Sequence, residues 1–475
     1  MTDLMNQFDN DNITGDVIVY YNIYKLNRLD DTIKKIYKRR LYDSLEMVED
    51  KDSVIGLKLK NIEGLENLRY FDRLILLDYN STCVEDDFSN IKYCLELKRL
   101  RFTYILEDMD VHGDAIDMIG NLVNLEHLEI YANLELYLDY LRDLKNLKVL
   151  KTNLYLSTNC IESYNIESLE YLDLGEIKAD CLLTYKECKN LKKINLDNVD
   201  YISENDLCMF LSNKSKLRIL ELPVNYTDSI EFLSEMKDLE ELILPQDYDG
   251  SIDVLENCKK LKKLTIYMCE DLNVLSEMKD LEELKLHWYT NDINIECVGN
   301  CKKLKVLSLG EDYTGEIEFL KSLVNLEYLD LGHKFVGNLD VLINCKKLKT
   351  LIVGVKFNNK IDILSELVDL EVLYLGYSFN KSIESLKRLN KLRELSIYSD
   401  FEFKIEDLSI KKLVLKNDSI LIRLGNLEKL EELVFVRIDN PLYNIPLTVK
   451  RIYKYNDVSS DILERSIIPL GCEFV

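Results

Sequence analysis

The sequence lacks most of the short motifs that mark an enzyme or a metal site. It contains only four histidines, and none has a partner at the spacing of a metal site or a catalytic triad: His112, His127, His287 and His333. It has no C-x-x-C pair, P-loop or G-x-S-x-G motif. We interpret "DVHGD" at 110–114 as an incidental loop, although it places His112 between two aspartates. These absences favour a non-enzymatic protein that holds no metal ion and no cofactor.

Long hydrophobic runs are also missing, and positive charge is in deficit. No apolar segment is long enough to span a bilayer. The formal net charge is -24, from 61 Lys and Arg against 85 Asp and Glu, and such a surface repels phosphate backbones and anionic lipids. The acidic start, "MTDLMNQFDNDN", is unlike a signal peptide. We therefore expect an intracellular, cytoplasmic protein that binds neither nucleic acid nor membranes.

What the sequence does contain is a repeated pattern of leucines. The unit LxxLxLxxxF/YxxxIxxL recurs mostly every 22 residues, and its first leucine is found at Leu125, Leu147, Leu169, Leu191, Leu217, Leu239, Leu261, Leu281, Leu304, Leu326, Leu348, Leu370 and Leu392. The L-x-L step is typical of a short strand with both leucines on one face. One unit cannot bury its own leucines, but stacked units bury a common column, and their strands form one long parallel sheet.

These units resemble the leucine-rich repeat of the 22-residue type, over about 80% of the chain. The resemblance implies an α/β solenoid, a horseshoe or arc with one long parallel sheet on its concave face and short helical, 3-10 or extended segments on its convex face. "LIVGVKFNNKI" at 351–361 and "LYLGYSFNKSI" at 373–383 also resemble the FNIP repeats of amoebae and their giant viruses, which would place the protein in a host cytoplasm if it is viral. The usual asparagine ladder is largely replaced by an aromatic residue one place later, at Tyr226, Tyr248, Tyr313, Phe335, Phe357 and Phe379.

The pattern predicts three parts: a cap or F-box-like module at 1–50, a solenoid of about seventeen rungs at 51–440, and a C-terminal cap at 441–475. In residues 13–42, apolar side chains recur at helical spacing and indicate a basic amphipathic helix.

The start of that stretch, with Ile13 and Asp16, weakly resembles an F-box. The resemblance implies a Skp-type adaptor as partner and a role in selecting substrates for ubiquitination. Two alternatives remain open. One is a plain helical cap, and the other is an import signal or anionic-surface contact formed by Lys34, Lys35, Lys38, Arg39 and Arg40.

The residue after the first leucine alternates in charge from one repeat to the next. It runs Glu126, Lys148, Glu170, Lys192, then Arg218, Glu240, Lys262, Glu282, Lys305, Glu327, Lys349, Glu371 and Arg393. Equivalent residues lie one strand apart, so the alternation predicts an exposed ladder of ion pairs that fixes the register. We expect a bulge in the 26-residue step from Leu191 to Leu217 to separate Lys192 from Arg218.

Four of the twelve cysteines occupy a core position of the repeat: Cys188, Cys258, Cys301 and Cys345. Other repeats place leucine, isoleucine or methionine there. Reduced cysteine behaves as a small apolar residue, so these are expected to be buried free thiols in a reducing compartment.

Function is expected on the concave face, as in other leucine-rich solenoids. Its exposed aromatic side chains are typical of interface hot spots, and the candidate partner-binding residues are Tyr267, His287, Trp288, Tyr289, Tyr328, Tyr374 and Tyr398. Tyr131 and Tyr171 also fall on non-leucine strand positions. The competing interpretation is that a chain with 29 tyrosines places some of them on this face without any role in binding. We predict a monomeric scaffold for a protein partner, with the substrate arm of a ubiquitin ligase as the alternative.

Overall fold

The computed structural model describes residues 17–22, 37–42, 54–60, 65–81, 88–104, 118–132, 135–136, 141, 143–152, 155–156, 166–175, 182–269, 271–287, 294–398, 408–415, 427–438, 441–443, 445–454 and 464–474. The chain forms two compact units, which are described separately. Unit 1 is Met1–Asp228 and unit 2 is Ser229–Val475.

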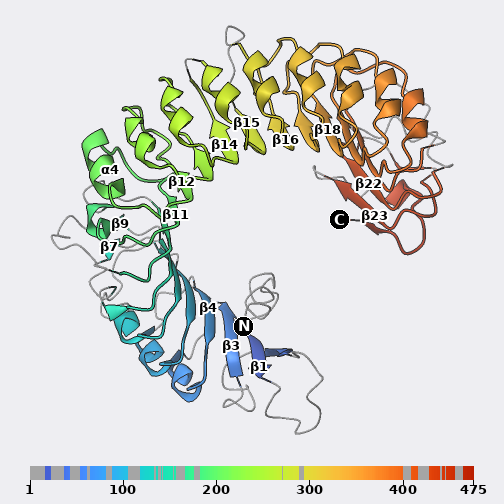
Figure 1. Cartoon of the computed structure of the whole chain (residues 1–475). Helices are drawn as coiled ribbons and strands as arrows, with labels where there is room; N and C mark the ends of the chain where they lie inside the picture. The colour runs from blue at the N-terminus through green and yellow to red at the C-terminus, as the bar shows by residue number, and fades with distance from the viewer. Residues whose placement is uncertain are drawn as a thin grey trace, which may run out of the picture. The chain divides into compact units, whose positions relative to one another are not determined.

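In unit 1, each repeat contributes one short strand that pairs in parallel with the strand of the next repeat (Figure 1), in the order β3, β4, β5, β6, β8, β10, β11, β12. The strands are β1 Val17–Asn22, β2 Tyr37–Tyr42, β3 Val54–Lys60, β4 Leu76–Ser81, β5 Arg99–Tyr104, β6 His127–Ala132, β7 Glu135–Leu136, β8 Val149–Thr152, β9 Tyr155–Leu156, β10 Tyr171–Leu174, β11 Lys193–Asn195 and β12 Ile219–Glu221. The helical segments are 3-10 turns, η3 Leu65–Tyr70, η4 Phe88–Tyr93, η5 Met118–Asn121 and η7 Leu183–Tyr185, and one α-helix, α4 Glu204–Leu211.

Unit 2 repeats the same plan with greater regularity. Its parallel strands are β13 Glu241–Ile243, β14 Lys263–Ile266, β15 Glu283–Leu286, β16 Val306–Ser308, β17 Tyr328–Asp330, β18 Thr350–Val353, β19 Val372–Leu375, β20 Glu394–Ile397, β21 Lys412–Leu415, β22 Glu432–Phe435, β23 Arg451–Lys454 and β24 Glu473–Phe474. Its 3-10 helices are η8 Glu231–Glu235, η9 Asp253–Asn257, η10 Asn273–Glu277, η11 Glu296–Asn300, η12 Glu318–Ser322, η13 Asp340–Asn344, η14 Asp362–Glu366 and η15 Glu384–Arg388. Because β23 and β24 extend the parallel sheet, strand pairing continues past residue 440.

The leucine pattern explains this architecture. Along β10, Tyr171 and Asp173 are half-exposed while Leu172 and Leu174 are buried, as the period of two requires. The first leucine of each described repeat is also buried, and the later apolar positions return through a 3-10 turn to the same core. In each unit the strands therefore lie on one side of the core and the short helices on the other (Figure 1). The predicted fold class is confirmed.

The predicted helix over 13–42 is wrong where the structure describes that stretch. β1 lies between β2 and β3 and is antiparallel to both. The run "VIVYY" consists of β-branched and aromatic residues, which favour strands, and the edge of β3 offers it backbone hydrogen-bond partners. Ile13, Asp16, Lys34 and Lys35 lie outside the described residues.

The alternating charges form ion pairs between neighbouring rungs, as predicted. Most join a cation to the glutamate of the rung before it: Lys148–Glu126 at 2.6 Å, Lys192–Glu170 at 2.8 Å, Lys262–Glu240, Lys305–Glu282 and Lys349–Glu327 at 2.6 Å, Arg393–Glu371 at 3.1 Å and Lys450–Glu431 at 2.9 Å. The lysines are about half exposed, so water and salt screen the pairs and each adds little to the stability. Their stronger effect is on register, because a slip by one rung would place like charges side by side.

The expected bulge in the long unit is not there. Lys193 of β11 pairs directly with Ile219 of β12, and the N–H of Arg218 donates to the carbonyl of Lys192 at 2.8 Å. The extra residues form α4 on the helix side, where Ser203 caps the N-terminus by accepting from the N–H of Asp206. A long repeat is thus accommodated without disturbing the sheet, and Lys192 and Arg218 stay on adjacent rungs.

The aromatic residues that replace the asparagine ladder form a stack in the core of unit 2. The ring centroids of Tyr313, Phe335, Phe357 and Phe379 follow one another at 6.5, 6.2 and 6.1 Å, with 6° between each pair of planes. All four side chains are fully buried. Each rung thus contributes one ring to a column that ties neighbouring turns together by packing.

The glycines of the L-x-L-G motif lie where successive backbones almost touch. A Cβ on Gly354 would lie 1.9 Å from the carbonyl oxygen of Gly332, and a Cβ on Gly376 would lie 2.3 Å from that of Gly354. Gly332 also has a φ of 76°, which only glycine adopts easily. These glycines are therefore required for the close approach between rungs.

The core cysteines are free and buried, as expected. Burial raises the pKa of Cys258 and Cys345 to about 11 and that of Cys301 to about 12. Thiols of this kind are unreactive near neutral pH, so their role is in packing.

The ladder leads to a testable expectation. Glu327→Lys would place three cations in a row on successive rungs, at the starts of the strands. It should lower the free energy of unfolding by about 1 kcal/mol at low ionic strength. Because exposed charges are screened, added salt should recover most of the loss. Urea unfolding at two salt concentrations measures both. Glu235→Lys on η8 makes the same charge change outside the ladder; an equal, salt-sensitive loss there would contradict the role of the ladder.

A second expectation concerns the glycine column. Gly354→Ala forces a backbone to move and should lower the free energy of unfolding by about 2–4 kcal/mol, seen as a shift of the urea midpoint. Gly299→Ala is the control, because its Cβ would meet the movable Ser322 side chain at 3.2 Å. Equal midpoints for the two variants would show that the close approach is not limiting.

Candidate interaction surface

The side chains that strands present away from the core form one continuous surface in each unit. We call it the sheet face and define it as the residues two and four places after the first leucine of each repeat. In β6 these are His127 and Glu129, and in β19 they are Val372 and Tyr374. Parallel pairing keeps equivalent positions adjacent, so each position becomes a column across the sheet. The chemistry of the surface therefore depends on which residue types occupy each column.

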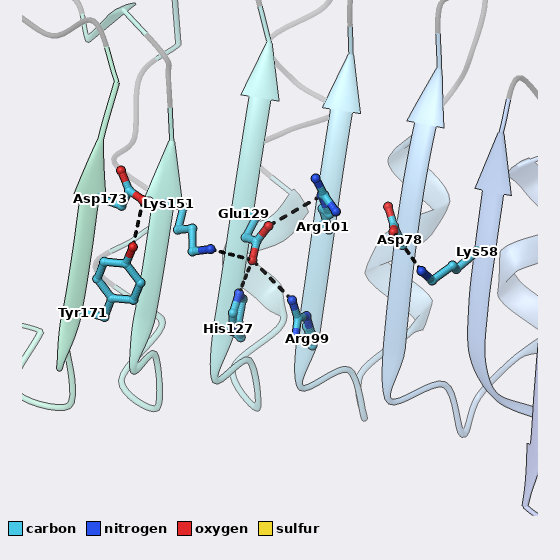
Figure 2. A network of polar contacts seen from close by, with 9 residues as sticks. All are labelled: Lys58, Asp78, Arg99, Arg101, His127, Glu129, Lys151, Tyr171 and Asp173. Atoms are coloured by element: carbon cyan, nitrogen blue, oxygen red, sulfur yellow. Dashed lines mark hydrogen bonds and ion pairs between the residues drawn. The ribbon is translucent and has the colours of Figure 1, made fainter. Parts of the chain in front are cut away.

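In unit 1 one column of the sheet face alternates in charge (Figure 2). From β3 to β10 it consists of Lys58, Asp78, Arg101, Glu129, Lys151 and Asp173, each in register with the next. Arg99 and His127 of the neighbouring column lie beside it. Lys58 pairs with Asp78 at 3.9 Å, and both are nearly buried. This charged column lies beside the tyrosines Tyr131 and Tyr171.

Glu129 is the centre of this network. Its Oε1 lies 2.6 Å from His127 Nε2, 3.3 Å from Arg99 and 3.4 Å from Lys151, while Oε2 lies 3.5 Å from Arg101 Nε. The Glu129 side chain is only 5% exposed, whereas Arg101 is 47% and Lys151 26% exposed. The carboxylate is therefore covered by the cations it holds, and the cations form the outer layer.

The pKa values follow from this arrangement. Burial alone would raise the pKa of Glu129, but the hydrogen bond from His127 and the charges of Lys151 and Arg99 outweigh it and lower the pKa to about 2. Burial lowers the pKa of His127, and the hydrogen bond to Glu129 opposes that effect. We assign the neutral imidazole with its proton on Nε2, which donates to Glu129 Oε1. Burial raises the pKa of Asp78 despite the nearby Arg101 and Lys58.

The structure brings together two of the aromatic residues predicted for the partner site. Tyr267 and His287 leave the ends of β14 and β15, and their rings stack at 4.4 Å between centroids with 16° between planes. Burial lowers the pKa of His287, which favours the neutral ring in this stack. Trp288 and Tyr289 lie outside the described residues.

The remaining predicted residues lie further along unit 2. The hydroxyl of Tyr374 donates to Glu394 Oε1 at 2.9 Å, across the β19–β20 pair. The ring of Tyr398 lies 5.4 Å from that of the exposed Tyr377, between centroids. Tyr328 is half-buried on β17, and burial raises the pKa of its hydroxyl. Tyr328 and Tyr374 lie on the sheet face, and Tyr398 lies just after β20. All three are on other strands than the stacked pair of Tyr267 and His287.

The charged network of unit 1 was not predicted from the sequence. In the sequence, His127 has no partner at the spacing of a metal site or a catalytic triad. In the structure, Glu129 lies two residues further along the same strand and contacts it. The signal is present in the sequence: the residue directly after the central strand leucine reads Lys58, Asp78, Arg101, Glu129, Lys151 and Asp173 in successive repeats. Finding it requires extending the repeat register to the irregular copies before Leu125.

Metal and membrane chemistry receive no support from the described residues. Among them no three His, Cys, Asp or Glu side chains gather in a way that could hold a metal ion. Likewise, no helix among them is long and apolar enough to cross a membrane. His112 lies outside the described part of the chain.

No family model matches the chain, and no curated protein matches it significantly. Solved structures do share its fold. A complex of TLR13 with ssRNA13 has a TM-score of 0.54 and 17% identity, over 83% of this chain and 65% of that chain. A leucine-rich-repeat protein of Leptospira interrogans gives 0.46 and 16%, over 86% and 91%, and the plant peptide hormone receptor RGFR1 in complex with RGF2 gives 0.47 and 20%, over 85% and 78%. At this identity the comparison shows the fold alone, a leucine-rich-repeat solenoid.

The network around Glu129 predicts a pH-dependent contribution to stability. Glu129→Gln leaves Arg99 buried without its anion and should lower the free energy of unfolding by about 2–4 kcal/mol at neutral pH. Because the folded-state pKa of about 2 lies below the ordinary 4.5, the carboxylate stabilises the fold fully above pH 4.5 and loses this effect as the pH falls towards 2. The difference between wild type and variant should shrink over that window.

Urea unfolding of both proteins from neutral to acidic pH measures this difference. Glu126→Gln is the matched control, since Glu126 is an exposed member of the ladder and its loss should change the free energy by less than about 1 kcal/mol. A pH-independent difference for Glu129→Gln would contradict the ion network.

Proposed function

We propose that this chain is a non-enzymatic, monomeric scaffold that binds a protein partner across its sheet face inside the cell. The observation that carries the proposal is the set of aromatic side chains held by consecutive strands of unit 2. Tyr374 and Tyr398 lie on or beside adjacent strands, and each is oriented by a neighbour, Glu394 or Tyr377. Rigid, partly exposed tyrosines supply contact area at a low entropic cost, as interface hot spots do.

The backbone of the sheet face supports the same proposal. Its strands are fixed by hydrogen bonds on both sides, so a partner would meet a surface that does not have to order on binding. The acidic composition disfavours nucleic acid and anionic membranes as partners.

The alternative, a substrate arm of a ubiquitin ligase recruited through an F-box, has no structural support in the described residues. It needs helices within 13–42, and β1 and β2 are strands there. Deleting residues 1–50 would test it poorly, because the deletion also uncovers the edge of β3. Substituting Ile13 and Asp16 by alanine avoids that difficulty: loss of a Skp-type adaptor and cullin from the captured proteins would revive the alternative.

The proposal is tested by affinity capture from lysate followed by reconstitution with the purified partner. Tyr374→Ala/Tyr398→Ala should weaken binding by about 2 kcal/mol or more, a factor of about 30, with thermal stability little changed. Tyr70→Ala/Tyr93→Ala is the matched control, because both tyrosines are 49% exposed on the helix side of unit 1. Equal affinities for the two double variants would place the contact elsewhere and overturn the assignment to the sheet face.

A further inference from the structure

The charges on the sheet face of unit 1 alternate in sign like those of the ladder, but their exposure is uneven. A ladder that only fixes register would be balanced and exposed, like the one along the strand starts. Here the two central anions are covered, with side-chain exposures of 10% for Asp78 and 5% for Glu129. Between and beside them, Arg101 is 47% and Lys151 26% exposed. Of these four side chains, which Figure 2 labels, the two cations are therefore the more accessible.

The local balance of charge is opposite in sign to that of the whole protein. The residues drawn in Figure 2 include four permanent cations, Lys58, Arg99, Arg101 and Lys151, against three carboxylates, Asp78, Glu129 and Asp173. With His127 neutral the network carries one net positive charge, in a chain whose formal net charge is -24. Lys193 on the next strand adds another cation. An isolated basic site on an acidic protein selects for an anionic group and repels most other basic surfaces.

The exposed cations are also held in place. Arg101 is fixed at Nε by Glu129 at 3.5 Å, and its guanidinium lies 5.9 Å from the ring centroid of Tyr131. Lys151 lies 3.4 Å from Glu129 and 5.6 Å from the ring centroid of Tyr171, which Lys193 also approaches at 4.6 Å. Cation–π contacts and a buried counter-ion reduce the rotamer freedom of both cations. Less ordering is then required when an anion binds.

The spacing of the two cations defines the ligand. Both side chains contact the single carboxylate of Glu129, from the strands on either side of it, so their charged groups lie closer together than the two strand spacings, about 10 Å, that separate their backbones. In an extended peptide only every second side chain points to the same face, and such side chains are about 7 Å apart, so acidic residues two places apart can reach both cations. We infer that the sheet face of unit 1 binds an acidic segment of the partner protein, with one carboxylate at Arg101 and a second at Lys151. This inference rests on the proposed function and names the chemistry of one contact.

A single-stranded nucleic acid would present anions too, but the surface fits it less well. Phosphates follow one another along the strand, and binding normally requires a continuous basic track. Here the column alternates: Asp78 lies on one side of Arg101, and Asp173 lies beyond Lys151. Two separated cations between acidic neighbours match two separated carboxylates better than a chain of phosphates.

The experiment uses the full-length protein and fluorescence anisotropy. The probe is a labelled peptide with aspartate at every second position, separated by glycine and serine; the control peptide has asparagine instead. Arg101→Gln/Lys151→Gln should weaken binding of the aspartate peptide about tenfold, and binding should fall as salt is added. Lys148→Gln/Lys192→Gln removes two cations from the exposed ladder of the same unit and should change affinity less than about twofold.

Three results would overturn the inference: no binding of the aspartate peptide to wild type, equal binding of the asparagine peptide, or equal losses in the two double variants. An oligouridylate that binds at least as tightly as the peptide, and is lost in Arg101→Gln/Lys151→Gln, would assign the site to nucleic acid instead. Circular dichroism and thermal melting show that the variants are folded.

Failure here can be told apart from failure of the proposed function. If Tyr374→Ala/Tyr398→Ala weakens binding of the reconstituted partner while the aspartate peptide fails, the scaffold stands and only the acidic contact is wrong.

Discussion

One carbonyl group per rung determines the geometry of the whole repeat array. The carbonyl of each ladder residue accepts two N–H groups from the next rung, as Glu240 does from Lys262 at 2.8 Å and from Lys263 at 3.0 Å. The same pair of bonds recurs at Glu282, Lys305, Glu327 and Lys349. Because two donors converge on one acceptor, a neighbouring strand cannot slip without losing both bonds. Register set in this way places every column of side chains.

The columns then divide the work between core and surface. Leucines, the stacked rings from Tyr313 to Phe379 and the free cysteines fill the core, where the fold gains most of its stability. Glycines allow the backbones to approach where a side chain would collide. The charges of the ladder add little to the free energy of unfolding, but they disfavour wrong registers. Only the sheet face is left to vary without loss of the fold, and it differs between the units. One of its columns is charged on six successive strands of unit 1, whereas in unit 2 charged, apolar and hydroxyl side chains alternate, among them Tyr328 and Tyr374.

The repeat could be predicted from the sequence because its information is local and repeated. Each L-x-L predicts a strand, and thirteen similar units average out any error in one of them. The prediction for the N-terminal segment was wrong because that segment occurs once and is not averaged over repeats. The β-branched and aromatic residues of "VIVYY" favour a strand, and the edge of β3 pairs with it as β1. Likewise, the sequence leaves open whether the extra residues before Leu217 form a bulge or a helix. Packing of their apolar side chains in the folded chain favours the helix α4.

The candidate interaction surface could be predicted less completely, for a related reason. Tyr267 and His287 were placed correctly on neighbouring rungs, and their stacking follows from the register. The Glu129 network needs the register of irregular early repeats, together with knowledge of which charges are covered. Exposure at 5% against 47% is a property of packing between strands, and no single-sequence pattern contains it.

The paired ladder also constrains how such a gene can grow or shrink. Recombination between repeats adds or removes whole rungs in frame, and the stacked core accepts any number of them. A single added rung would bring two like charges together at the junction, as Lys192 and Arg218 already are. Two added rungs would keep every lysine beside a glutamate. The number of repeats should therefore change two at a time, by 44 residues. Where it changes by a single repeat, we expect a charge substitution near the junction.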